Sequence, residues 1–252
     1  MTYMGNKGRH PFYAKLLIAL LYLLIWQGLS MAVGSALLLP SPVATIARFG
    51  RLLTQWESYR TVGLTMARIM GGYVLGVAAG ILLGALTAKV PFANALLSPL
   101  RSVVKATPVT SFILLALLWL SSGMVPLFIA FLMVLPIVWA NTLEAVLHTD
   151  QKLLEMGTMF RFGRVKTLTK IYLPSVLPSL LAACTTALGF AWKSGVAAEI
   201  IALPKASIGY RLYEAKLSIE TVDLFAWTLL VVLMSMALEK ALVTLLGRIR
   251  HD

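Results

Sequence analysis

Apolar runs long enough to cross a lipid bilayer restrict the fold of this chain more than any other feature of its sequence. A helix needs about 20 apolar residues to span the hydrocarbon core of a membrane. Because 59% of the residues are hydrophobic and only 13% are charged, a water-soluble fold could not cover the apolar side chains. We therefore expect one all-α integral membrane domain over residues 1–252, with about six transmembrane helices at 16–35, 61–88, 108–120, 125–147, 173–199 and 222–246. The third run is short, and the segment from Pro91 could supply the turns that it lacks.

Basic residues between the runs predict the orientation of the chain, because cytoplasmic loops carry an excess of Lys and Arg. With a cytoplasmic N-terminus, the inner side carries Lys7, Arg9, Lys15, Lys89, Arg101, Lys105, Lys152, Arg161, Arg164, Lys166, Lys170, Arg248 and Arg250. The outer side carries Arg48, Arg51, Arg60, Lys205, Arg211 and Lys216, partly offset by Glu57, Glu214, Glu220 and Asp223. We expect both termini in the cytoplasm, with 1–15 as a cytoplasmic N-terminal segment and the first run as a retained anchor rather than a cleaved signal peptide.

Charge, cysteine and motif content argue against several other classes of protein. A net charge of +12 would suit nucleic-acid binding, but the basic residues lie mainly beside apolar runs, so membrane orientation explains them better. Cys184 is the only cysteine and the three histidines lie far apart, so we expect no metal site. The phosphate-binding pattern Gly-x-x-x-x-Gly-Lys-Ser/Thr is absent, and no span contains a histidine that could act as a base. We therefore do not expect an enzyme.

Two local patterns predict contacts with other helices or partners. Gly72, Gly76, Gly80 and Gly84 recur every four residues and share one helix face, and small residues on one face let helices approach closely in lipid. The polar, strongly basic loop at 148–172 contains a short amphipathic helix at 151–160. Such a helix on the cytoplasmic face either lies on lipid or docks in a groove of a partner protein.

This loop resembles the cytoplasmic signature of binding-protein-dependent importer permeases: Glu-Ala-Ala, three residues, Gly, nine residues, Ile, one residue, Leu-Pro. Glu155 lies at the Glu, Ile171 at the Ile, and Leu173 and Pro174 at the Leu-Pro. Further landmarks resemble the nitrate, sulfonate and taurine group of these permeases: Leu39-Pro40-Ser41-Pro42, Thr65, Arg68, Gly72, Tyr73, Pro99-Leu100, Lys105, Pro108, Trp119, Ala198-Glu199, Gly209 and Asp223.

The loop departs from the signature at three positions. Met156 and Gly157 replace the two alanines, and Arg161 replaces the glycine. We expect the nearby Gly163 to supply the flexible turn instead. The spacing of the signature is unchanged.

The resemblance implies a type I ABC importer permease (MetI-like) fold in the bacterial inner membrane, with 61–247 as its core and 148–172 as a coupling loop. In such importers two permease subunits, often two copies of one chain, line a path for the solute. Two cytoplasmic ATPases bind ATP and Mg beneath them, and an extracytoplasmic binding protein delivers the solute. The permease itself binds no cofactor. The resemblance implies a coupling role for Glu155, Met156, Gly157, Arg161, Gly163, Leu173 and Pro174.

Four polar residues are candidates to line the path: Thr110, Ser111, Lys193 and Glu199. Charged side chains within a span are costly and are often functional. Lys193 could offer positive charge to a small anionic solute, of the sulfonate, taurine or nitrate type, or it could pair with a group elsewhere in the bundle. The alternative function is a secondary transporter driven by an ion gradient, which would need intramembrane carboxylates or broken helices in repeated halves.

Overall fold

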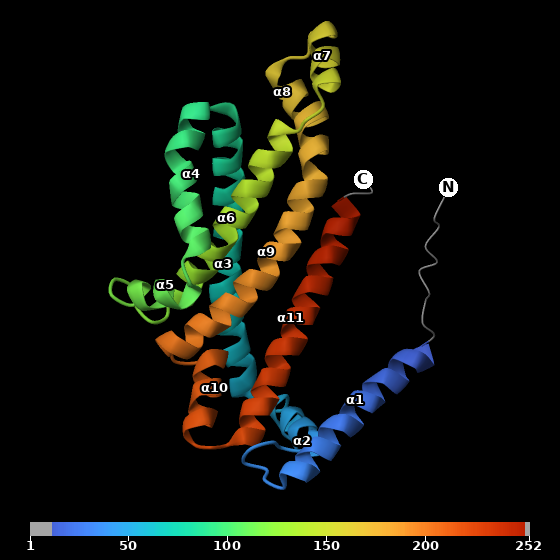
Figure 1. Ribbon diagram of the computed structural model, residues 1–252, viewed down its shortest axis with the longest axis vertical. Helices are drawn as coiled ribbons and strands as arrows, with labels where there is room; N and C mark the ends of the chain where they lie inside the picture. Colours follow the sequence, from blue (N-terminus) through green and yellow to red (C-terminus); the bar gives the residue numbers. More distant parts are fainter. Residues whose placement is uncertain (1–11, 250–252) are drawn as a thin grey trace.

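The computed structural model describes residues 12–249, and within that range every regular element is a helix (Figure 1). The all-α prediction is therefore confirmed. Lys7, Arg9 and Arg250, which contributed to the predicted orientation, lie outside the described residues, as does most of the predicted N-terminal segment. The elements are α1 (Phe12–Val33), α2 (Pro42–Leu52), α3 (Trp56–Lys89), α4 (Pro91–Ala106), α5 (Val109–Ala116), α6 (Val125–Leu147), α7 (Gln151–Met159), α8 (Arg164–Thr167), the π-helical turn η1 (Leu168–Tyr172), α9 (Leu173–Ala202), α10 (Ile208–Leu217) and α11 (Thr221–Ile249).

Five helices in this range are long and apolar enough to cross a membrane: α1, α3, α6, the continuous helix Arg164–Ala202, and α11. The third predicted span, 108–120, instead holds only the short helix α5, and the segment from Pro91 forms a separate helix, α4. α4 ends before Thr107, which takes an extended conformation (φ −80°, ψ 131°) because the ring of Pro108 disfavours a helical residue before it. The following helix α5 has eight residues and is about 12 Å long, too short to span the hydrocarbon core.

Two basic residues that we expected in an inner loop, Arg101 and Lys105, lie instead on helix α4. Pro91 begins this helix directly after α3, and α4 then folds back to pack beside α3 and α6 (Figure 1). Lys105 therefore lies about 21 Å along the helix from Pro91, and Arg101 stacks over the Trp139 ring at 5.4 Å. These two cations lie along the bundle, beyond the turn that joins α3 to α4.

The centre of the bundle is built from α3, α6 and α9, which share the most extensive helix contacts. All four glycines of the stripe on α3 are buried and face α6. A Cβ atom at Gly76 would lie 2.8 Å from the Cβ of Val134, and one at Gly84 would lie 2.5 Å from that of Thr142. The two helices are therefore too close for any side chain at these positions, which is the packing that small-residue faces allow in lipid.

Two spans lie at the edge of this bundle. α1 has no buried residue in its apolar stretch Leu16–Val33, and only 6% of the corresponding stretch of α11 is buried. In Figure 1, α1 leans away from the other spans and contacts the bundle near α2. α1 presents its apolar side chains to the surroundings, as lipid-facing helices do, whereas α11 also packs on the core through Ala226, Trp227 and Leu230.

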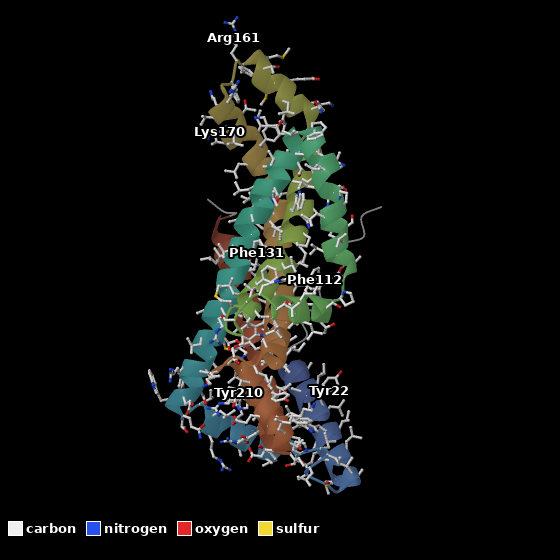
Figure 2. The ribbon with its side chains drawn as sticks, turned by 90° about the vertical axis from the view of Figure 1, so that its left-hand side faces the viewer. Tyr22, Phe112, Phe131, Arg161, Lys170 and Tyr210 are labelled. Atoms are coloured by element: carbon white, nitrogen blue, oxygen red, sulfur yellow. The ribbon has the colours of Figure 1, made fainter. Side chains whose placement is uncertain are left out.

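The two ends of the bundle differ in which loops they carry. α7 and α8 lie at one end, and α2 and α10 lie at the other (Figure 1). Figure 2 shows Arg161 and Lys170 at the first end and Tyr210 towards the second. The loops that we predicted to be cytoplasmic and extracytoplasmic are thus separated along the length of the molecule.

Candidate functional site

The loop with the importer signature forms a short helix, α7, with well-defined ends. Its N-cap is Asp150, whose Oδ1 accepts a hydrogen bond from the backbone N–H of Lys152 at 2.9 Å. At the other end, the N–H of Phe162 donates to the Gly157 carbonyl at 2.8 Å, and the N–H of Arg161 donates to the Thr158 carbonyl at 3.0 Å. This pair of hydrogen bonds is a Schellman motif, whose residue after the C-cap adopts a left-handed conformation and is usually glycine.

Arg161 occupies that left-handed position, with φ of 51°. It stands where the signature has glycine, so the helix-ending turn explains why glycine suits the position. The expectation that Gly163 would supply the turn is wrong. Gly163 has φ −68° and ψ 163°, an extended conformation open to any residue, and no atom lies within 4 Å of the position that a Cβ would take.

The two halves of the signature meet in space. Gly157 is buried in the loop, and a Cβ added there would lie 2.8 Å from Cδ1 of Ile171. Glu155 and Met156 are exposed on the other side of α7. α7 is therefore held through Gly157 and Ile171, while its free side is available to a partner.

Pro174 does not start a new helix, as the span predicted at 173–199 implied. The helix runs continuously from Arg164, with the π-helical turn η1 just before Leu173 and Pro174. A proline lacks a backbone N–H and its ring crowds the preceding turn, and a π-turn widens the helix where such crowding occurs. Both residues are exposed on the helix that leads from α7 into the bundle.

Replacing Arg161 by glycine is expected to stabilise α7 locally. A left-handed conformation costs a residue with a side chain about 1 kcal/mol, so amide exchange in α7 should slow by about fivefold in Arg161→Gly. Hydrogen–deuterium exchange of the purified chain measures this, with Lys152→Gly as the control, because glycine in the first turn of α7 should speed exchange. Equal or faster exchange in Arg161→Gly would contradict the assignment of strain to this residue.

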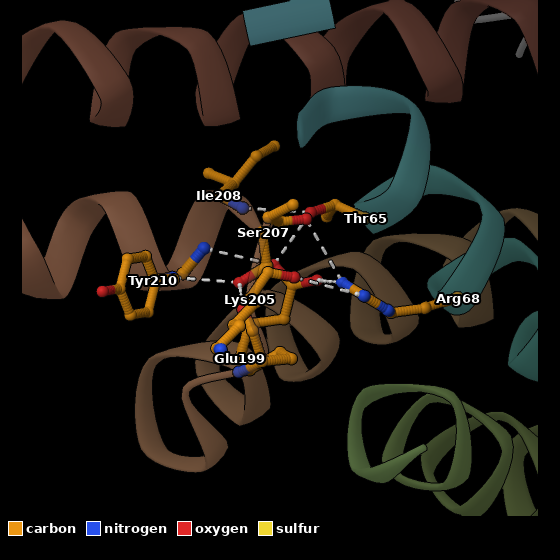
Figure 3. Close-up of polar contacts among 10 residues, drawn as sticks. Thr65, Arg68, Glu199, Lys205, Ser207, Ile208 and Tyr210 are labelled. Carbon is orange, nitrogen blue, oxygen red and sulfur yellow. Dashed lines mark hydrogen bonds and ion pairs between the residues drawn. The ribbon is translucent and has the colours of Figure 1, made fainter. Parts of the chain in front are cut away.

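A second polar site lies at the opposite end, around Glu199 (Figure 3). Glu199 lies near the end of α9 and its side chain is fully buried. Its Oε2 accepts hydrogen bonds from Thr65 Oγ1 at 3.0 Å and from the Gly209 N–H at 3.1 Å. Arg68 Nη1 lies 3.6 Å from Oε1, an ion pair too long for a hydrogen bond. Arg68 also reaches two backbone carbonyls of the loop before α10.

These contacts provide acceptors for the first backbone N–H groups of α10. Such groups have no partners within their own helix. The N–H groups of Ile208, Gly209 and Tyr210 donate to the side chains of Thr65, Glu199 and Ser207 at 3.0, 3.1 and 3.1 Å. A Cβ at Gly209 would overlap Glu199 and the backbone of α9, so only glycine fits there. The carboxylate lies at the positive end of the α10 dipole, and the network joins α3, α9 and α10.

The other candidates for the path lie on helix surfaces. Lys193 is exposed on α9, Thr110 is exposed on α5, and Ser111 beside it is half-buried. α5 packs against the C-terminal part of α9 through Ile113 and Ala198, so the candidates lie on neighbouring helices. Within residues 12–249 no hydrogen bond or ion pair joins them. Glu199, in contrast, reaches no open surface.

Charges that we placed on the outer side form ion pairs around a cleft of about 650 Å³. Arg48 of α2 makes a bidentate contact with Asp223 of α11, and Arg211 bridges Glu57 and Glu214. The hydrogen bond to Asp223 raises the pKa of the Arg48 guanidinium. The sequence indicated that these residues share one side of the membrane, but it did not indicate which ones pair.

Comparison with known proteins agrees with this architecture. Residues 76–249 match the family described as "Binding-protein-dependent transport system inner membrane component". This match includes α7, Glu155, the Leu173–Pro174 pair and Glu199, and it covers more than half of the chain.

Three relatives carry names for different solutes. SsuC of Bacillus subtilis, named for transport of aliphatic sulfonates, is 28% identical over 88% of this chain and 80% of its own length. The bicarbonate transport permease CmpB of a Synechocystis strain is 27% identical over 77% and 73%. The riboflavin transport permease RibX of Chloroflexus aurantiacus is 27% identical over 73% and 69%. Permeases of this family function with ATP-binding subunits and a solute-binding protein. The chain belongs to this family of inner-membrane components, and it is the membrane-spanning permease of an ABC importer rather than an enzyme or an ion-driven secondary transporter.

Proposed function

We propose that this permease carries a small anionic solute. The observation that carries the proposal is Lys193, an exposed lysine within an apolar spanning helix and about 14 Å from the outer end of α9 at Ala202. A lysine at that depth is costly unless a counter-charge accompanies it, and a passing anion supplies one. Lys105 on α4 is a second exposed cation along the bundle. The names of the sulfonate and bicarbonate relatives support an anion, although the riboflavin relative means that family membership alone does not fix the solute.

Lys193→Gln is expected to reduce uptake of the anionic solute by about tenfold or more, because the desolvated anion loses its counter-charge. Uptake of labelled alkanesulfonate and of bicarbonate by cells that express the whole transporter would be measured. Lys193→Arg should retain uptake, and Lys240→Gln, which removes an exposed lysine from α11, should not change it. Full uptake in Lys193→Gln would show that this lysine pairs elsewhere.

We also propose that α7 is the coupling helix and that it docks in a cleft of a cytoplasmic ATPase. Exposed Glu155 and Met156 would contact the ATPase, with Arg161 at the tip and Leu173 and Pro174 on the helix that follows. In this arrangement α7 and both termini are cytoplasmic. Two ATPases hold ATP and Mg beneath two copies of this permease, and the binding protein meets the end that carries α2 and α10. The exposed apolar faces of α4 and α5 leave surface for the second permease.

Purification of the tagged chain from its host tests this assignment. We expect Glu155→Arg to reduce recovery of the ATPase by about tenfold or more, because it reverses a charge at the docking surface. Glu239→Arg on the exposed side of α11 is the matched control and should retain the ATPase. Native mass spectrometry of the recovered complex counts the subunits. Equal recovery of the ATPase with Glu155→Arg and with the native chain would contradict the proposal that α7 docks on the ATPase.

A further inference from the structure

A cleft near the α7 end is lined by none of the residues that we propose to contact the ATPase or to line the path. It measures about 720 Å³ and lies between the C-terminal ends of α3 and α6 and the helical segment α8–η1. Ala85, Val146, Leu168 and Tyr172 form much of its wall. Much of the wall of this cleft between the helices is therefore apolar.

Two cations line this cleft, and no acidic residue does. Lys89 is the last residue of α3, and Arg164 is the first residue of α8. Both are exposed, and neither forms an ion pair with any residue between 12 and 249. The cleft thus offers uncompensated positive charge beside an apolar wall.

The position of the cleft suits a lipid rather than a soluble anion. Lys89 ends a spanning helix, so the cleft lies at the boundary between hydrocarbon and water. Basic pockets between transmembrane helices at this boundary bind the headgroups of anionic lipids. A soluble anion would use the two cations but would leave the apolar wall exposed to water.

We propose that this cleft binds an anionic phospholipid, with its phosphate between Lys89 and Arg164 and an acyl chain along Ala85 and Leu168. The bound lipid would join the end of α3 to the segment α8–η1, which is the second half of the 148–172 loop. With the proposed orientation of the chain, the cleft lies in the inner leaflet of the membrane, but binding of the lipid does not depend on that orientation. Lipid binding and ATPase recovery are therefore measured separately on the same preparations.

Native mass spectrometry of the full-length chain in detergent tests the site by titration with phosphatidylglycerol and with phosphatidylethanolamine. We expect phosphatidylglycerol to bind more tightly, and K89Q/R164Q to weaken it by about tenfold or more. The matched control R60Q/K240Q removes one exposed arginine and one exposed lysine outside the cleft, and it should bind the lipid as the native chain does.

A second variant separates the apolar wall from the charges. Ala85→Trp keeps both cations but places a large side chain in the cleft, and it should also weaken phosphatidylglycerol binding. Glycerol 3-phosphate, which has the phosphate without acyl chains, should not displace the lipid. Unchanged binding in K89Q/R164Q, equal loss in R60Q/K240Q, or displacement by glycerol 3-phosphate would each overturn the proposal.

Discussion

Gly72→Ala is expected to destabilise the permease by about 2–3 kcal/mol, the cost of forcing an extra group into a packed interface. The new Cβ would overlap the backbone carbonyl of Leu127 and lie 2.9 Å from the Cβ of Ala130. A backbone atom cannot rotate away as a side chain can, so α3 and α6 would have to separate along their shared face. Thermal unfolding of the detergent-purified chain should shift down by about 5–10 °C.

Gly63→Ala is the matched control, because it makes the same substitution in the same helix. Gly63 is exposed, and no atom lies within 4 Å of the position that its Cβ would take. Alanine favours a helix more than glycine by about 1 kcal/mol, so this variant should be neutral or slightly more stable. Equal destabilisation by the two variants would contradict this explanation, because the loss of stability would then not depend on the close approach of α3 and α6.

Features that repeat along one helix could be predicted from the sequence. The four-residue spacing of the glycines indicated a common face, because residues four apart lie above one another on a helix. The identity of the opposing helix could not be predicted, because spacing within α3 says nothing about α6. The same limit applies to the importer signature, whose spacing identified the loop but not the contact between Gly157 and Ile171.

Local backbone geometry was predicted less well. The 108–120 run is apolar enough for a span, but Pro108 makes Thr107 extended and so ends α4 at Ala106, a break that a hydropathy count does not register. We expected Gly163 to supply the flexible turn, whereas Arg161 adopts the left-handed conformation there. The hydrogen bonds of the helix end, not the nearest glycine, determine which residue takes that conformation.

The sequence also did not predict which distant charged residues form pairs. Arg68 and Glu199 were both recognised as landmarks, but they are 131 residues apart and belong to different helices. Glu199 was assigned to the path because a charged residue in a span is often functional. Its burial against Thr65 and Gly209 favours a second role, which is to hold α10 on the bundle.

That role predicts that Glu199→Ala lowers stability by about 3 kcal/mol, with a fall of about 6–12 °C in the unfolding temperature. The substitution leaves the Gly209 N–H without its acceptor and Arg68 without its counter-charge. Because the Arg68 side chain is 20% exposed, water compensates part of this loss, and the lower end of the usual range for a broken buried pair applies. Glu199→Gln keeps an oxygen acceptor and should cost about 1–2 kcal/mol.

Two comparisons separate the network from a general effect of losing a carboxylate. Glu239→Ala removes an exposed carboxylate from α11 and should change stability by less than about 0.5 kcal/mol. Thr65→Ala combined with Glu199→Ala should cost less than the sum of the single changes, because both side chains hold the start of α10. If the losses of stability were additive, the network would be contradicted. If the Glu199→Ala chain were stable but impaired in uptake, Glu199 would instead belong to the solute path. Loss of stability with a non-additive pair would instead support one network of side chains that joins α3, α9 and α10.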